Sequence, residues 1–275
     1  MTTTGAIAMQ WEELSGDQFA GAIEECQGVC LLPLSVIERH GHHLPLGTDM
    51  YIGGEVCRRA ALIEPAIVFP DYIFTQIPEA RHVAGTIAID GDLMMRLLDN
   101  VCREIARNGL KKIVLVNSHG GNTGLISLFN MLQLESPRDY VIYVVEPHSL
   151  LFGGDLEVPW DPGDGEHAGP GETSLMQVIR PDLVNMEKVP ADDEAQPRNR
   201  LQALREAGVQ TGMWWYADYP THYAGEANAA SPGVGERLLE ALVEALVKAV
   251  RAIKADNTTR RLQDEFFAAS EKPQA

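Results

Sequence analysis

The sequence predicts an α/β fold in which helices cover both faces of a central, mainly parallel sheet. Short apolar runs, typical of strands buried on both faces, alternate along the chain with segments of helical periodicity. Polar, glycine-containing motifs follow two of these runs, and open α/β sheets build their sites at the carboxyl ends of strands. A single domain over residues 1–275 is the simplest division, because the sequence contains no internal repeat or low-complexity block.

The first elements alternate as this fold requires. Ser15 is a typical N-cap for a helix over residues 16–26. The apolar run VCLLPL at 29–34 predicts a buried strand, the spacing within 50–63 predicts a helix, and AIVFP at 66–70 is typical of a strand.

The alternation continues through the middle of the chain. Asp90 can cap the next helix, and Gly109 stands where a glycine commonly ends one. Apolar strands are predicted at 111–117 and 140–146, with an apolar helix at 124–134 between them.

The C-terminal part has a different character. A polar connector that contains proline lies at 189–200, and a long amphipathic helix is predicted at 231–256, with Ser231 as its cap and Pro232 at its first position. The Leu/Val/Ala stripe of this helix is typical of a core face or a subunit contact. We expect the tail at 269–275 to be frayed.

The composition excludes some partners. The chain has 275 residues, is 45% hydrophobic and carries a formal net charge of -17, so it can bury a sizeable core and would repel nucleic acid and anionic membranes. No apolar run approaches the roughly 20 residues that span a bilayer, and the N-terminus lacks a signal-peptide pattern, so we expect a cytoplasmic protein. The cysteines form no Cys-x-x-Cys pair and are expected to be reduced: Cys26, Cys30, Cys57 and Cys102.

The segment SVIERHGHHLPLGTD follows the first buried strand and is rich in potential metal ligands. Glu38 and His40 are two residues apart, so in an extended segment both side chains point the same way. Asp49 follows a stretch that can turn the chain back, and carboxylates with an imidazole suit a divalent ion. A hydrogen-bonded polar loop would also explain these residues, but the density of ligand types favours a metal site. His42 and His43 are expected to support the ligands, to face substrate or to be structural.

Two further motifs carry reactive side chains. His119 lies in NSHGGN, directly after the strand at 111–117, where it could be a ligand or part of a glycine-rich turn. The segment GEHAGPGETS contains Glu166, His167 and Glu172, and it opens the helix SLMQVIR. Glu172 could complete a metal site or only favour the helix N-terminus, and His167 could transfer a proton.

Other signals are absent or weak. The chain has no G-x-S-x-G, H-E-x-x-H or Walker A motif, and its glycines do not form G-x-G-x-x-G. His148 and His222 stand alone and are expected to be structural. Trp214 and Trp215 could line a pocket, although buried aromatic side chains usually pack.

Together the motifs resemble those of the creatininase (creatinine amidohydrolase) family. ERHGHHLPLGTD, NSHGGN and HAGPGETS occur in that family's order and spacing, and RHVAGTIAID is similar to another of its segments. The resemblance spans residues 31–180. It implies an α/β fold with a binuclear metal site, hydrolysis of rings or amides in small polar molecules, and assembly as hexamers.

The resemblance assigns roles by motif position. Glu38 would bind one ion together with His119, His40 would bind the other ion, and Asp49 would bridge the two. Glu172 would supply a further carboxylate, as in those relatives that lack one in the NSHGGN motif.

The chain departs from the creatinine-hydrolysing members at two places. Gly121 replaces a glutamate that is a ligand in those members, so either Glu172 supplies the missing carboxylate or the second metal site is weak. Those members also carry a tryptophan a few residues before EHAG, whereas the nearest tryptophan here is Trp160. Creatinine itself is therefore not the expected substrate. Other family members deformylate pyrimidine precursors, trim a peptide or open a keto-inositol ring.

The main hypothesis is a metal-dependent hydrolase that cleaves a cyclic amide or another C–N bond of a small polar substrate, with two Zn, Mn or Fe ions. Two cations about 3.5 Å apart would activate a hydroxide and polarise the carbonyl, and His167 or Glu172 would pass the proton to the leaving group. One alternative is a hydrolase that opens a C–C or lactone-type ring in a keto-inositol or keto-sugar. Another is a non-catalytic metal- or ligand-binding protein. We expect a small-molecule substrate, no nucleic-acid or membrane partner, and assembly of the chain as a homo-oligomer.

Overall fold

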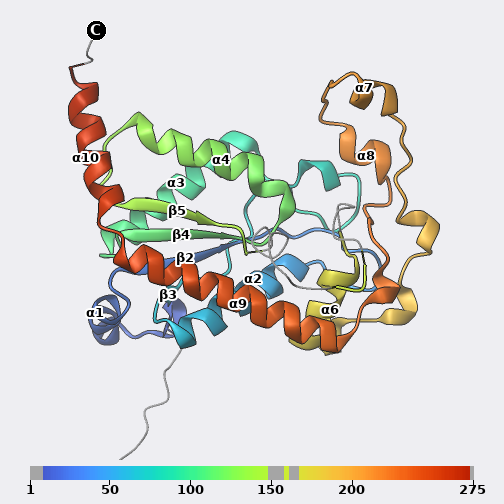
Figure 1. Cartoon of the computed structure of the whole chain (residues 1–275), viewed down its shortest axis with the longest axis horizontal. Helices are drawn as coiled ribbons and strands as arrows, with labels where there is room; N and C mark the ends of the chain where they lie inside the picture. The colour runs from blue at the N-terminus through green and yellow to red at the C-terminus, as the bar shows by residue number, and fades with distance from the viewer. Residues whose placement is uncertain (1–8, 148–157, 161–166, 273–275) are drawn as a thin grey trace, which may run out of the picture.

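A five-stranded parallel sheet forms the centre of the molecule (Figure 1). The computed structural model describes residues 9–147, 158–160 and 167–272. The strand order is β1-β3-β2-β4-β5, and every pairing is parallel, so the predicted α/β fold is confirmed. The strands are β1 Met9–Gln10, β2 Val29–Leu34, β3 Ile67–Val68, β4 Lys112–Asn117 and β5 Val141–Val145.

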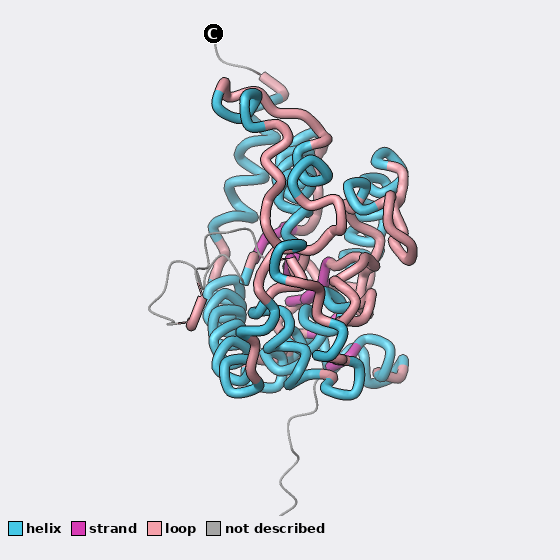
Figure 2. Tube along the Cα trace, turned by 90° about the vertical axis from the view of Figure 1, so that its right-hand side faces the viewer, coloured by secondary structure: helices cyan, strands magenta, loops and turns pink. Residues whose placement is uncertain are grey.

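Helices surround this sheet, as Figure 2 shows from the side. In the described part of the chain the α-helices are α1 Gly16–Glu25, α2 Thr48–Ile63, α3 Gly91–Arg107, α4 Thr123–Leu132, α6 Pro170–Ile179, α7 Gln202–Glu206, α8 Trp214–Asp218, α9 Pro232–Ala255 and α10 Thr258–Ser270. No helix among these described residues has the length and apolar character needed to cross a membrane.

Most predicted elements form close to their expected bounds, two differ from them, and β1, α7 and α8 were not predicted. The strand predicted at 66–70 is reduced to the two residues of β3. Helix α6 begins earlier than its apolar run, at Pro170, because proline is well suited to the first position of a helix. Helix α10 was not predicted, and it continues to Ser270, past the start of the tail expected to fray.

Each face of the sheet packs against its own set of helices. In β4, Val114 and Val116 belong to the core cluster that includes α2 and α9, whereas Ile113 and Leu115 belong to the cluster that includes α3 and α4. This alternation is what a strand buried on both faces requires. The four cysteines are free, as predicted, and all four are buried.

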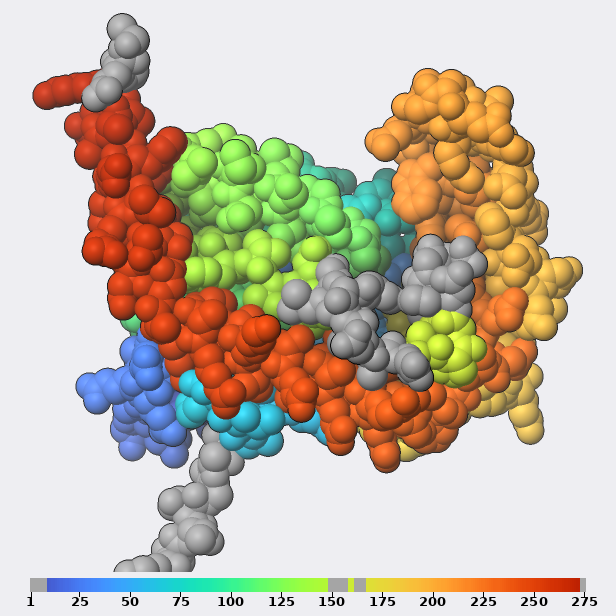
Figure 3. All heavy atoms as spheres, viewed as in Figure 1, coloured from blue at the N-terminus to red at the C-terminus, as the bar shows by residue number. Residues whose placement is uncertain are grey.

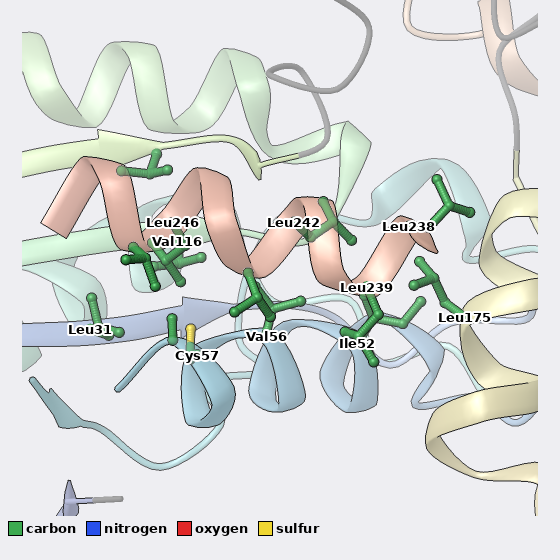
Figure 4. Packing of buried hydrophobic residues seen from close by; sticks show 14 of the residues in the cluster. Leu31, Ile52, Val56, Cys57, Val116, Leu175, Leu238, Leu239, Leu242 and Leu246 are labelled. Atoms are coloured by element: carbon green, nitrogen blue, oxygen red, sulfur yellow. The ribbon is translucent and has the colours of Figure 1, made fainter. Parts of the chain in front are cut away.

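Helix α9 fastens α2 and α6 to one face of the sheet. Its side chains interleave with those of α2, and Figure 4 shows Leu239 beside Ile52. Burying one such side chain contributes about 1.5–3 kcal/mol. Gly235 allows the closest approach of α9 to α6, because a Cβ at this position would lie only 2.0 Å from the Ser174 carbonyl oxygen. The position of α6, which carries Glu172, therefore depends on this packing.

The carboxyl ends of β2 and β4 lie side by side at the centre of the sheet. Leu34 pairs with Asn117, and the Ser118 hydroxyl donates to the Leu34 carbonyl at 2.8 Å. In the sheet, β3 lies on one side of β2 and β4 lies on the other side. The carboxyl ends of β2 and β4 are therefore a topological switch point, where ligands commonly bind in α/β folds. Farther along the chain, the segment with α7 and α8 stands out from the body (Figure 3).

Candidate metal centre

Glu38, His40, Asp49 and His119 converge where β2 and β4 end. The two carboxylate oxygens of Asp49 face different histidines: Oδ1 lies 3.2 Å from His40 Nε2, and Oδ2 lies 3.2 Å from His119 Nδ1. His119 Nδ1 also lies 2.9 Å from Glu38 Oε1. All four residues are buried. The structure therefore brings the two carboxylates and the imidazole of the first motif together with His119, an imidazole from a distant part of the chain.

Local structure positions each of these side chains. Glu38 and His40 belong to the segment after β2. A hydrogen bond from the Glu38 N–H to the Leu46 carbonyl at 3.0 Å closes the loop between Glu38 and Leu46. Asp49 lies in the first turn of α2, where the helix dipole favours a carboxylate. His119 directly follows β4, and its backbone N–H donates to Asn117 Oδ1 at 3.2 Å.

Several atoms at the centre of this cluster are buried without a hydrogen-bond partner. They are Glu38 Oε1, His40 Nε2 and Asp49 Oδ2. Their contacts with one another have suitable lengths but not hydrogen-bond directions, and a buried polar group left unpaired costs about 1–3 kcal/mol. One possible metal-ligand atom from each of these three residues lies within 4.8 Å of the other two. Oxygen and imidazole nitrogen ligands in this arrangement fit a divalent ion such as Zn, Mn or Fe.

Glu172 and His167 approach the same centre from the C-terminal side. Glu172 Oε2 lies 3.7 Å from His40 Nε2 and accepts a hydrogen bond from the Ala168 N–H at 2.6 Å. His167 donates from Nε2 to the Arg39 carbonyl at 2.8 Å, and this nitrogen lies 3.7 Å from Glu38 Oε2. Glu172 therefore reaches the side of the cluster where His40 lies, and Glu166 lies outside the described residues.

His222 is the residue whose place the sequence did not predict. We expected it to be structural, but its Nε2 lies 2.5 Å from Glu38 Oε2, and its Nδ1 accepts a hydrogen bond from Trp215 Nε1 at 2.7 Å. The one sequence signal is that both residues belong to the aromatic segment WWYADYPTHY. Trp214 is 56% exposed, and His148 lies outside the described residues.

The other two histidines of the first motif do not reach the centre. His42 is exposed and contacts Arg39. His43 is buried, and its Nε2 lies 2.9 Å from the Thr173 hydroxyl, which ties the loop to α6. Burial, reinforced by the positive charge of His40, lowers the pKa of His43 to about 4. His43 therefore stays neutral and holds two ligand-bearing segments together.

Gly121 lies in a polar niche beside His119. A Cβ here would lie 2.5 Å from His119 Nε2, 2.6 Å from Gln76 Oε1 and 2.9 Å from Glu79 Oε1. Gln76 donates from Nε2 to Glu79 Oε2 at 2.5 Å, which keeps both side chains in this niche. A larger residue at position 121 would displace them, so the segment after β3 occupies the space around this glycine.

Charges at the centre are balanced by protons when no cation is bound. Burial alone would lower the pKa of His40, but Asp49 and Glu172 outweigh it and raise this pKa to about 10. Burial opposes the charged form of His119 too, yet Glu38 and Asp49 raise its pKa well above the usual range. Protonated His40 and His119 thus supply positive charge between the carboxylates.

His167 behaves differently from these two histidines. Burial lowers its pKa to about 3 and outweighs the attraction of the Glu38 carboxylate. His167 is therefore a neutral imidazole at the edge of the centre in the metal-free protein. The Glu38 carboxyl itself keeps a pKa well below its usual value, because its contacts with protonated His119 and the hydrogen bond from His222 outweigh the effect of burial.

The chain is similar to one protein family and to several known proteins. The family model Creatininase, described as creatinine amidohydrolase, matches residues 12–250. Over 196 residues, covering 66% of this chain and 74% of the relative, the sequence is 28% identical to creatinine amidohydrolase of Pseudomonas putida. It is 28% identical over 234 residues, 80% of this chain and 83% of the relative, to a mycofactocin precursor peptide peptidase of Mycobacterium tuberculosis.

A third relative has a different named activity. Over 149 residues, 53% of this chain and 56% of the relative, the sequence is 30% identical to 2-amino-5-formylamino-6-ribosylaminopyrimidin-4(3H)-one 5'-monophosphate deformylase of Methanobrevibacter smithii.

Solved structures of creatininase share the fold. One creatininase structure has a TM-score of 0.71 at 23% identity and covers 91% of this chain and 99% of its own. Another, described as creatininase Mn, has a TM-score of 0.68 at 25% identity and covers 90% and 100%. A mutant described as the Zn-Zn type has a TM-score of 0.69 at 23% identity and covers 90% and 99%.

Proposed function

The chain belongs to the creatininase family, as its motifs predict, and we propose that it is a binuclear metal-dependent hydrolase. The family and its relatives support a metal-dependent hydrolase that acts on C–N bonds. The observation that carries the proposal is the buried group of ligand atoms on Glu38, His40 and Asp49 that have no hydrogen-bond partner. Structures of family members with Mn and with a Zn-Zn site support divalent ions as its cofactors.

We assign the ligands from the contacts. Asp49 would bridge two ions, because its oxygens face His40 and His119 separately, each at 3.2 Å. Glu38 and His119, 2.9 Å apart, would hold one ion. His40 and Glu172, 3.7 Å apart, would hold the other, so that Glu172 takes the place of the glutamate that Gly121 lacks.

Ions bound here would supply two functions, lowering the pKa of a water molecule and polarising the substrate carbonyl. His167 would receive the proton. Its Nε2 donates to the Arg39 carbonyl, which leaves Nδ1 to accept a proton and lets the carbonyl stabilise the resulting imidazolium. His167 would then give this proton to the leaving nitrogen. Glu172 remains a carboxylate in this scheme, because its Oε2 accepts the Ala168 N–H.

The substrate class that fits best is a small polar molecule with an amide, cyclic amide or formamide bond. The named relatives hydrolyse such bonds in creatinine, in a peptide and in a formylamino pyrimidine. The non-catalytic alternative is open because Gly121 lacks a ligand side chain. Glu172 argues against this alternative, because its carboxylate, 3.7 Å from His40, would complete a second ligand set.

Three further expectations remain predictions. We propose that residues 1–275 form one domain, that the protein is cytoplasmic and that it assembles as a homo-oligomer, such as the hexamer implied by its family. Exposed apolar side chains on α4 and α10 support the last of these, because a subunit contact would cover them: Leu128, Met131, Leu262 and Phe266.

A hydrolysis screen tests the proposed function. Protein stripped of metal and reconstituted with Zn, Mn or Fe would be offered cyclic amides, hydantoins, formamides, lactones and keto-inositols. We expect hydrolysis of an amide-type substrate that disappears with a chelator and returns with metal. Hydrolysis of lactones or keto-inositols alone would favour the ring-opening alternative. Full activity in the presence of the chelator would contradict the proposal.

A further inference from the structure

A chain of two hydrogen bonds leads from a tryptophan to a carboxylate of the metal centre. Trp215 Nε1 donates to His222 Nδ1 at 2.7 Å, and His222 Nε2 lies 2.5 Å from Glu38 Oε2. His222 and Glu38 are each 1% exposed. These contacts join the segment before α9 to the segment after β2.

The first hydrogen bond fixes the tautomer of His222. An indole nitrogen can only donate a hydrogen bond, so His222 Nδ1 must be the acceptor and carries no proton. The neutral imidazole then bears its proton on Nε2, which donates to Glu38 Oε2. A histidine that binds a metal ion through Nε2 needs a lone pair on that nitrogen, so this tautomer cannot be a ligand.

We propose that His222 is a positioning residue, held by Trp215 in the tautomer that occupies one oxygen of Glu38 and leaves the other for metal. Glu38 Oε2 is engaged by His222, whereas Oε1 has no hydrogen-bond partner and lies 2.9 Å from His119 Nδ1. The carboxylate thus presents one defined oxygen to the centre. The inference rests on the proposed function in one respect, the binding of a cation by Glu38.

The backbone of His222 supports this role. Its φ is 56°, in the left-handed region that a residue with a side chain rarely adopts. Its N–H donates to the Tyr219 carbonyl at 2.9 Å, which closes the turn that aims the ring at Glu38. Backbone strain of this kind persists where surrounding contacts hold it, and it is common at functional sites.

The tautomer can be measured without metal or substrate. Long-range nitrogen–proton NMR correlations of the metal-free protein would report which nitrogen of His222 carries the proton. We expect the Nε2–H tautomer in the wild type and in Trp214→Phe, a control that changes the neighbouring exposed indole. Trp215→Phe, which keeps an aromatic ring but removes the donor, is expected to show a mixture of tautomers. An Nδ1–H tautomer in the wild type would overturn the inference.

Zinc affinity tests the consequence for the metal centre. By equilibrium dialysis, Trp215→Phe and His222→Phe are expected to bind zinc about 10- to 100-fold more weakly, as is typical when a partner of a ligand is removed. His222→Gln, which keeps an N–H donor, should recover part of this loss, and Trp214→Phe should bind as the wild type does. Circular dichroism would establish that each variant is folded.

The outcomes separate this inference from the proposed function. Unchanged zinc affinity in folded Trp215→Phe and His222→Phe would overturn the positioning role. A wild-type protein that binds no divalent ion would overturn the proposed function and, with it, the role of His222 in metal binding. The wrong tautomer in a protein that does bind zinc would overturn this inference alone.

Discussion

The two walls of the metal centre differ in how their polar atoms are used. The strand wall consists of Glu38, His40, Asp49 and His119, and in it Glu38 Oε1, His40 Nε2 and Asp49 Oδ2 are buried without hydrogen-bond partners. The C-terminal wall consists of the three remaining site residues, His167, Glu172 and His222. Its atoms near the centre already have protein partners.

Those partners come from backbone groups and one indole. His167 Nε2 donates to a carbonyl, Glu172 Oε2 accepts an N–H, and His222 Nδ1 accepts from Trp215. The difference suggests a division of labour. In the proposed function, the strand wall would present ligands to a cation, whereas the C-terminal wall would orient a carboxylate, supply one further ligand and transfer a proton.

Removing the bridging carboxylate from the strand wall should have the largest effect. Asp49→Asn takes a charge from between His40 and His119, so the chain should lose bound metal. The rate of amide hydrolysis should fall by about 10⁴-fold or more, because activation of water by metal is lost. Metal analysis and steady-state kinetics would measure both. A variant that kept its metal would show that Asp49 is not a bridge.

A change in the C-terminal wall should separate activity from metal content. His167→Asn is expected to keep its bound metal and to lower kcat by on the order of 10²- to 10³-fold, the usual contribution of a proton-transfer group. The same two measurements apply. If metal is lost together with activity, His167 is a ligand and the two walls do not differ as described.

The pH dependence of zinc binding should reveal the protons held by the strand wall. The pKa of His40 is raised to about 10 in the metal-free protein, so below that pH a cation must displace a proton. Zinc affinity should therefore rise with pH between about pH 6 and pH 8, by about tenfold per unit for each proton displaced. Competition with a zinc-buffering dye would measure it. An affinity that does not change with pH would contradict the protonation described for His40 and His119.

The same raised pKa has a consequence for the metal-free fold. The ion pair of His40 with Asp49 contributes stability that is fully present below the unfolded pKa of about 6.5. That contribution is lost as pH rises through the folded pKa of about 10. Urea unfolding of metal-free protein over this range should therefore show stability falling toward high pH.

The smallest effect is expected from one methyl group beside His119. Gly121→Ala would press on His119, Gln76 and Glu79, so unfolding should require about 1–3 kcal/mol less free energy, and zinc affinity should fall. Gly120→Ala is the matched control, because a Cβ there meets no atom within 4 Å. Chemical denaturation of both variants would measure the difference. Equal stability would show that the niche at Gly121 is not tightly packed.

The strand wall could be predicted because its residues stand where local sequence rules apply. Glu38 and His40 share one extended segment, Asp49 begins the next helix, and His119 directly follows a strand that was recognised from its apolar run. Parallel neighbours then bring these ends together. The sequence alone did not show that β2 pairs with β4, and the structure was needed to establish this pairing.

The C-terminal wall could be predicted only in part. Glu172 and His167 stood out through their motif, but His222 reaches Glu38 from 184 residues away. The segment that carries His222 consists of short helices and turns without periodicity, so its sequence does not predict where His222 lies in the fold. Contact between Trp215 and His222 arises from one turn with a left-handed residue, which side-chain patterns do not reveal.

The most direct test of the proposed binuclear metal centre is the metal content of purified, reconstituted protein, compared between the wild type and Glu38→Gln. We expect about two divalent ions per wild-type chain, the number that a bridged pair requires. We expect substantial loss of metal from Glu38→Gln, with an unchanged circular dichroism spectrum. Equal metal content in the two proteins, or a wild-type chain that retains no divalent ion, would contradict it.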